Sequence, residues 1–121
     1  MIMVEQEAHT LSKAERLCGK NDISRLLKEG KYSFSPLFRC CVLKDNCLDY
    51  NRIMVSVPKK SFKRAVKRNL LKRRIRESYR LQKHEFSAEK HVDIMFMYTP
   101  KEVRSFGEIY EEVGNIIRRI K

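Results

Sequence analysis

The stretch from Lys59 to Arg76 reads KKSFKRAVKRNLLKRRIR and holds ten of the chain's 27 lysines and arginines, without a single acid. The whole chain has a formal net charge of +12, so the remainder carries 17 basic residues against 15 acids, or +2. The positive charge is therefore concentrated in one segment. A field of this kind attracts polyanions, and nucleic acid is the first candidate for a partner.

The same stretch has a helical period that separates its apolar and polar side chains. At about 100° per residue, Leu71, Ile75 and Tyr79 fall on one line, which gives the helix an apolar face to pack on a core. A polar stripe on the far side consists of Asn69, Arg73, Arg76 and Arg80, and Lys72 borders it. Successive members of the stripe lie about one turn apart, so the stripe can follow a phosphate backbone.

The start of this helix is electrostatically unfavourable. Its positive dipole end is crowded by Lys63, Arg64, Lys67 and Arg68, and each unneutralised cation there costs roughly 0.3 to 1 kcal/mol. Arg68 also falls near the apolar line, so either the helix starts irregularly or Arg68 makes a specific contact at its edge. A solvated face or a targeting signal is the ordinary explanation of a basic helix. A local conflict of this size instead favours a functional surface that binds an anion.

Length and composition predict one soluble domain. A chain of 121 residues buries a sizeable core without disulfides or metal, and 35% charged with 42% hydrophobic residues is typical of globular proteins. We find neither an apolar run long enough to span a membrane nor the pattern of a signal peptide. We therefore expect a cytoplasmic protein without membrane association, with a mobile tail at residues 1–14 and one folded domain at residues 15–121, which the resemblance described below identifies as RNA-binding.

The expected elements follow in the order helix, strands, helix, strand, helix. The first helix is capped by Asn21 or Asp22, buries Ile23, Leu26 and Leu27, and ends at a left-handed Gly30. Strands are expected at residues 32–34, 37–44 and 52–57, the last two as the halves of one hairpin. The basic helix is expected at residues 62–83 with Ser61 as its cap, followed by a buried strand at residues 92–98. A capping box of Ser105 and Glu108 starts the last helix. This order predicts an α+β fold, with helices packed on a small mixed four-stranded sheet.

Nothing in the sequence indicates a catalytic or metal site. The cysteines lack metal-binding or redox spacing and are interpreted as buried small apolar residues, namely Cys18, Cys40, Cys41 and Cys47. The three histidines are scattered, and Asp45, Asp49 and Asp93 are interpreted as two loop acids and one strand acid. The chain is therefore predicted to be a binder with no catalytic residues and no small-molecule substrate.

The segment AVKRNLLKRRIRE, at residues 65–77, resembles the signature helix of the protein subunit of bacterial ribonuclease P. The matching positions are Ala65, Val66, Arg68, Asn69, Lys72, Arg73 and Arg76. Upstream, Arg52 and the SVPKK segment at residues 56–60 look like the strand and paired lysines that precede that helix. The segments Arg16–Leu17 and DISRLLKEG at residues 22–30 are similar to the family's first helix and its glycine stop. The resemblance covers residues 15–121.

The resemblance implies a protein cofactor of a ribonucleoprotein that removes the 5′ leader from precursor tRNA by endonucleolytic cleavage. In that family the RNA subunit carries the chemistry, with Mg²⁺ held mainly by the RNA. The partners implied are the catalytic RNA and precursor tRNA. The family also joins a strand, the basic helix and the next strand by a left-handed crossover, against the usual preference.

The resemblance further implies which residues contact RNA. Contact with RNA is expected at Arg52, Lys59, Lys60, Arg68, Asn69, Lys72, Arg73 and Arg76, and charge and position add Lys67 and Arg80. A cleft between the sheet and the first helix, which holds single-stranded leader in the family, maps onto Ile23, Leu27, Phe38 and Cys41. Family members often have aromatic residues where this chain has Ile23, Leu27 and Cys41, so plain core packing is an equal alternative for those three.

Three other functions are compatible with a basic α+β domain. A non-enzymatic binder of ribosomal or messenger RNA would need no catalytic RNA partner. A DNA-binding regulator is disfavoured because no short helix and tight turn precede the basic helix. A protein-only nuclease would cut without an RNA subunit and would depend on a carboxylate such as Asp93.

Overall fold

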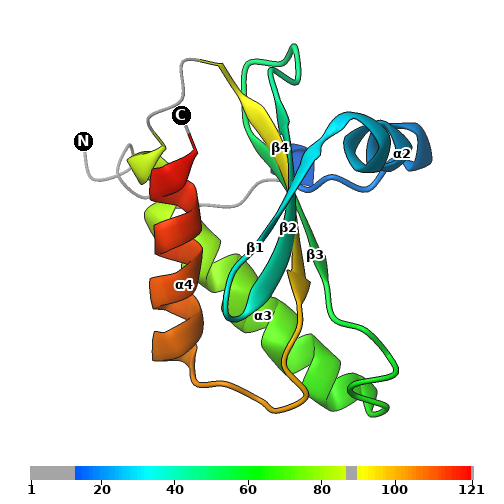
Figure 1. Ribbon diagram of the computed structural model, residues 1–121, viewed down its shortest axis with the longest axis vertical. Helices are drawn as coiled ribbons and strands as arrows, with labels where there is room; N and C mark the ends of the chain where they lie inside the picture. Colours follow the sequence, from blue (N-terminus) through cyan, green and yellow to red (C-terminus); the bar gives the residue numbers. More distant parts are fainter. Residues whose placement is uncertain (1–12, 87–89, 121) are drawn as a thin grey trace.

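The computed structural model describes residues 13–86 and 90–120, and the predicted α+β order is confirmed (Figure 1). The helices are α2 (Lys20–Glu29), α3 (Ala65–Gln82) and α4 (Phe106–Arg119), with short 3₁₀ helices η1 (Lys13–Glu15) and η2 (Lys83–Glu85). The strands are β1 (Lys31–Phe34), β2 (Phe38–Lys44), β3 (Arg52–Ser56) and β4 (Val92–Tyr98). Residues 1–12 of the predicted tail lie outside the described residues, while residues 13 and 14 belong to η1.

The four strands form one mixed sheet in the order β1-β2-β4-β3. The predicted hairpin of β2 with β3 is wrong, because β4 lies between them, antiparallel to β2 and parallel to β3. The physical reason is that β4 buries residues on both of its faces, and such a strand gains most from a central position. The hairpin is instead formed by β1 and β2.

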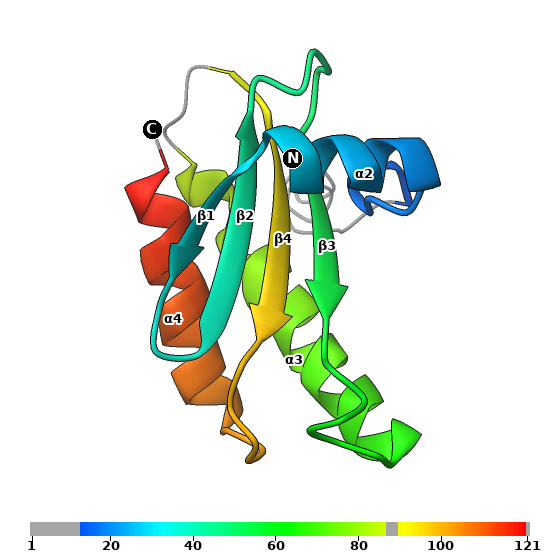
Figure 2. The same ribbon diagram turned by 45° about the vertical axis from the view of Figure 1, so that its right-hand side comes forward.

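The connection from β3 through α3 to β4 is left-handed. In Figure 2, β3 and β4 both run downward, β4 lies to the left of β3, and α3 lies behind the sheet. A right-handed crossover would require β4 on the other side of β3. The expected crossover is therefore confirmed, and it places the basic helix beneath the β3 edge of the sheet.

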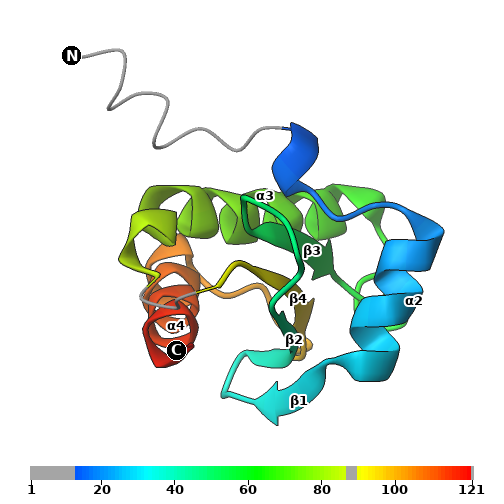
Figure 3. The ribbon, with the colours of Figure 1, turned by 90° about the horizontal axis from the view of Figure 1, so that it is seen from above.

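The two faces of the sheet carry separate apolar clusters. Helices α3 and α4 pack together on one face, whereas α2 lies on the opposite face (Figure 3). The larger cluster includes the predicted apolar face of α3, with Leu71, Ile75 and Tyr79 all fully buried. The smaller cluster lies beneath α2 and contains Leu17, Leu26, Cys41, Leu43 and Met95. Strand alternation assigns each sheet residue to one face or the other.

The helix termini match the sequence at one place and differ at two. The capping box of α4 is confirmed, since the Glu108 backbone N–H donates to Ser105 Oγ at 3.2 Å. By contrast, α3 begins at Ala65 rather than after Ser61, and Arg64 is its N-cap without a side-chain hydrogen bond. Likewise α2 begins at Lys20 after Gly19, so neither Asn21 nor Asp22 is its cap.

Gly30 ends α2 for a different reason from the predicted one. Its φ angle is −73°, so it is not in the left-handed region. A Cβ at this position would lie 2.5 Å from the carbonyl oxygen of Leu26 and 2.6 Å from the Cys41 sulfur. Glycine is therefore required here because α2 turns into β1 in close contact with β2.

Candidate nucleic-acid interface

The predicted polar stripe of α3 lines one open groove. The groove has a volume of about 500 Å³, and its walls comprise Arg16, Asn69, Arg73, Arg76, Glu77 and Arg80. All four predicted members of the stripe are present, because the spacing of four, three and four keeps them on one side of the helix. The arrangement presents several guanidinium groups to a single elongated ligand.

The groove concentrates positive charge. Four arginines face one acid, Glu77, which gives a formal lining charge of 4 − 1 = +3, and Glu77 forms an ion pair with Arg80. Burial lowers the pKa of Arg76, and the nearby charge of Arg16 lowers it further. Burial and the like charge of Arg16 both disfavour the charged form of Arg76, and a bound phosphate group would offset that cost.

Arg16 is the member of the groove that sequence reasoning did not assign to RNA contact. The segment before α2 lies along the β3 edge, where the Leu17 backbone N–H donates to the Ile53 carbonyl at 2.7 Å. Leu17 is buried beneath α2, so its neighbour Arg16 is directed to the other side, beside Arg76. The sequence did not indicate RNA contact at Arg16, because this arginine belongs to no helical pattern. The apolar Leu17 after it was consistent with an alternation in which the two side chains face opposite sides.

Arg68 makes a specific contact at the edge of the helix. Its guanidinium donates to the carbonyl oxygens of Phe62 at 2.7 Å and Lys63 at 2.9 Å. Arg68 therefore holds the loop before α3 against the helix, which explains its place near the apolar line. It also positions the exposed lysines at this end of the molecule, namely Lys59, Lys60 and Lys67. RNA contact by Arg68, by half-exposed Lys72 and by these lysines stays a prediction.

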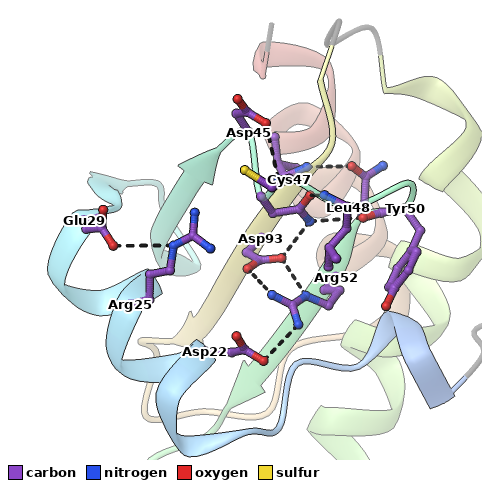
Figure 4. A network of polar contacts seen from close by, with 12 residues as sticks. Asp22, Arg25, Glu29, Asp45, Cys47, Leu48, Tyr50, Arg52 and Asp93 are labelled. Carbon is purple, nitrogen blue, oxygen red and sulfur yellow. Dashed lines mark hydrogen bonds and ion pairs between the residues drawn. The ribbon is translucent and has the colours of Figure 1, made fainter.

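Arg52 has a structural role, and its contact with RNA stays a prediction. Its guanidinium binds both carboxylate oxygens of Asp93, at 2.9 and 2.7 Å, and a third nitrogen reaches Asp22 of α2 at 3.1 Å (Figure 4). Asp93 is 1% exposed and also accepts from Asn46 Nδ2 at 2.9 Å. The hydrogen bond with Asp93 raises the pKa of Arg52. Arg52 therefore ties α2 to the sheet and fixes the cleft between them.

The predicted leader cleft is present only in part. Phe38 is fully buried on the opposite face, against Phe96 and Tyr98, so its assignment to the cleft is wrong. Its strand neighbour Arg39 faces the α2 side instead, because successive strand residues alternate. Cys41 does face α2 but is fully buried, and its thiol donates to the Leu26 carbonyl at 3.3 Å. Burial raises the pKa of Cys41.

The remaining two cleft residues lie at the surface of α2. Leu27 is 38% exposed, and Ile23 is half-buried against the smaller cluster. Beyond α2, the same face of the sheet carries the half-buried side chains of Met54, Ser56 and Met97. The surface is therefore apolar, without aromatic side chains, at Ile23 and Leu27.

Searches for other kinds of site were confined to the described parts of the chain. Within residues 13–86 and 90–120, no three His, Cys, Asp or Glu side chains are grouped to hold a metal ion. In the same ranges, no helix has the length and apolar character needed to cross a membrane.

Comparisons with known proteins identify the same relatives from sequence and from structure. A family model described as Ribonuclease P matches residues 11–121. The ribonuclease P protein component of Porphyromonas gingivalis is 34% identical over 119 residues, covering 91% of this chain and 85% of the relative. The solved ribonuclease P protein from Thermotoga maritima has a TM-score of 0.75 at 31% identity and covers 88% of this chain and 98% of that one. The Staphylococcus aureus protein gives a TM-score of 0.75 at 27% identity, with coverages of 90% and 100%.

Proposed function

Because the chain belongs to the ribonuclease P protein component family, we propose that it binds the catalytic RNA subunit of ribonuclease P and promotes removal of the 5′ leader from precursor tRNA. The groove of α3 contacts the catalytic RNA, and the α2 face of the sheet contacts the leader. The observation that carries the proposal is the groove itself, in which Arg16, Arg73, Arg76 and Arg80 converge.

The proposal assigns binding to the protein and hydrolysis to the RNA. Arginines in a row on a rigid helix suit a phosphate backbone, since each guanidinium can donate two parallel hydrogen bonds to one phosphate. The same charge repels a divalent cation, which supports the view that Mg²⁺ is held by the RNA. Bound Mg²⁺ supplies an activated water and stabilises the leaving oxygen. The protein contributes by neutralising RNA phosphates and by holding the leader.

The two proposed surfaces lie on opposite faces of the sheet and are joined at the β3 edge. Arg16 belongs to the groove, while the next residue, Leu17, is part of the cluster beneath α2. A small hollow of about 160 Å³ contacts both Arg16 and Arg76 on one side and Met54 on the other. One RNA-bound protein can therefore present leader-binding residues close to the catalytic RNA.

Reconstituted cleavage tests the proposal. The protein would be mixed with a cognate ribonuclease P RNA and 5′-labelled precursor tRNA, at Mg²⁺ too low for the RNA alone to act. We expect cleavage at the mature 5′ end only when both components are present. Tight binding without rescue of cleavage would contradict the proposal and favour a general RNA-binding function.

A further inference from the structure

The β1–β2 hairpin carries an aromatic cluster that is not among the predicted RNA-contacting residues. The Arg39 guanidinium lies over the Tyr32 ring at 4.9 Å and over the Phe34 ring at 5.8 Å from the ring centroids. Strand pairing sets these residues on one face, since Phe34 pairs with Arg39 and Tyr32 pairs with Cys41. That face is the one beneath α2, because the Tyr32 hydroxyl donates to the Leu27 carbonyl at 3.1 Å.

Phe34 is far more exposed than its partners. Its side chain is 74% exposed and Tyr32 is 43% exposed, so a planar ligand has room beside the Phe34 ring that Arg39 does not occupy. Arg39 is not explained as a charge that protects an edge strand from pairing with another chain. Arg39 lies on β2, which is paired on both sides by β1 and β4, whereas protective charges belong on the edge strand itself.

The surroundings favour a phosphate-bearing ligand. The end of the hairpin, at residues 34–36, borders an open hollow of about 530 Å³ against α4. Its lining includes Arg118 and Arg119 and one acid, Glu112. Phe34 therefore has Arg39 over its ring on the α2 face and also borders a hollow with Arg118 and Arg119 on the α4 side, where Arg118 pairs with Glu85. Aromatic rings flanked by cations are the elements with which proteins bind single-stranded nucleic acid, by stacking on a base and neutralising its backbone.

We propose that Phe34, Tyr32 and Arg39 form a stacking platform for one unpaired base of single-stranded RNA, on the α2 face of the sheet at its β1 edge. Arg39 orients the two rings, and Phe34 offers the open ring face. The platform deepens the proposed function and rests on it for the identity of the RNA, which is the 5′ leader of precursor tRNA. It supplies aromatic stacking in a chain whose cleft positions are Ile23, Leu27 and Cys41.

Binding of a short single-stranded RNA to the full chain tests the platform directly. The probe would be an oligonucleotide of leader length that contains the fluorescent base 2-aminopurine at one position at a time. We expect quenching at one or two adjacent positions with the unmodified protein. Phe34→Ala should remove this quenching and weaken binding roughly 5-fold to 150-fold, the range for loss of one stacked base.

Two further variants separate stacking from apolar contact and from fold. Phe34→Leu keeps apolar surface without a ring and should also lose quenching, whereas Phe34→Trp should retain it. Tyr32→Phe removes the hydrogen bond to α2 but keeps the ring, and should quench like the unmodified protein. If Phe34→Ala left both the quenching and the affinity unchanged, the proposed platform would be contradicted.

The assembled ribonucleoprotein then distinguishes the platform from the proposed function. We expect Phe34→Ala to weaken the binding of precursor tRNA and to leave the binding of mature tRNA unchanged. Equal weakening of both RNAs would overturn assignment of the platform to the leader. If the unmodified complex did not prefer precursor over mature tRNA, the proposed function would fail, and the oligonucleotide result would still decide the platform.

Discussion

Replacement of Arg73 by alanine should reduce the salt dependence of RNA binding by about one phosphate contact. Arg73 is exposed in the groove, so its removal leaves the core of the protein intact. Each neutralised phosphate contributes a slope of roughly 0.7 to 0.9 in a plot of log affinity against log salt. If each of the four groove arginines neutralises one phosphate, a rise from about 50 to 200 mM salt weakens binding about 50-fold to 150-fold. With three phosphates, the same rise weakens binding only about 20-fold to 40-fold.

The assay is equilibrium binding of the catalytic RNA at several salt concentrations. Arg73→Lys is one control, because it keeps the charge but loses the two-pronged hydrogen bond, so affinity should fall without a change of slope. Lys90→Ala is a second control, since Lys90 is exposed, pairs with Asp45 and lies outside the groove. An unchanged slope in Arg73→Ala would refute the reasoning that the groove binds phosphates.

Three other changes test the fold that positions these surfaces. Arg52→Ala leaves buried Asp93 without its cationic partner and should lower the free energy of unfolding, measured by urea titration, by about 3 to 5 kcal/mol. A loss below about 1 kcal/mol would contradict the stabilising role of Arg52 between α2 and the sheet. Gly30→Ala should destabilise the protein by about 1 to 3 kcal/mol because the new methyl group meets backbone. Gly107→Ala is the control, since the nearest atom to its new methyl group would be 4.0 Å away and no destabilisation is expected. Equal thermal stability of the two variants would exclude the clash. Cys40 and Cys41 are buried as predicted, whereas Cys18 and Cys47 are exposed, so the prediction of burial is wrong for those two. A disulfide reagent at pH 8 should modify Cys18 and Cys47 quickly and Cys40 and Cys41 only on unfolding, since burial raises both pKa values, that of Cys40 to about 12. Rapid reaction of all four thiols would contradict this burial.

The basic helix and its groove could be predicted because both depend on local spacing. A period of 3.6 residues assigns Leu71 and Arg73 to opposite faces whatever the rest of the chain does. The capping box of α4 was predictable for the same reason. The position of Arg16 was not, because it depends on the pairing of Leu17 with Ile53, 36 positions away in the chain (53 − 17 = 36).

The sheet shows where local reasoning fails. Adjacent strands in the sequence suggested a β2–β3 hairpin, but the apolar strand β4 separates them, and such long-range pairing leaves no local signal. The face of each β2 residue was equally uncertain, because a shift of one residue exchanges the two faces. That shift decides whether Phe38 or Arg39 faces α2. The family resemblance indicated the strand β2 but not which of its residues face α2.

The close approach at Gly30 could not be predicted either. A glycine after a helix usually indicates a left-handed stop, and only the folded chain shows the Cys41 sulfur and Leu26 carbonyl beside it. Arg52 illustrates the same limit, since the resemblance suggested RNA contact but could not show its buried partner Asp93 on another strand.

Cleavage of precursor tRNA by the reconstituted ribonucleoprotein, with the double variant Arg73→Ala/Arg76→Ala, tests the central claim most directly. At low Mg²⁺ and about 200 mM salt, we expect the double variant to support cleavage only at a much higher protein concentration than the unmodified chain. The maximal rate should be recovered once the catalytic RNA is saturated, because the groove acts in binding. Cleavage by the double variant at the unmodified protein's concentration would contradict the assignment of the groove to the catalytic RNA.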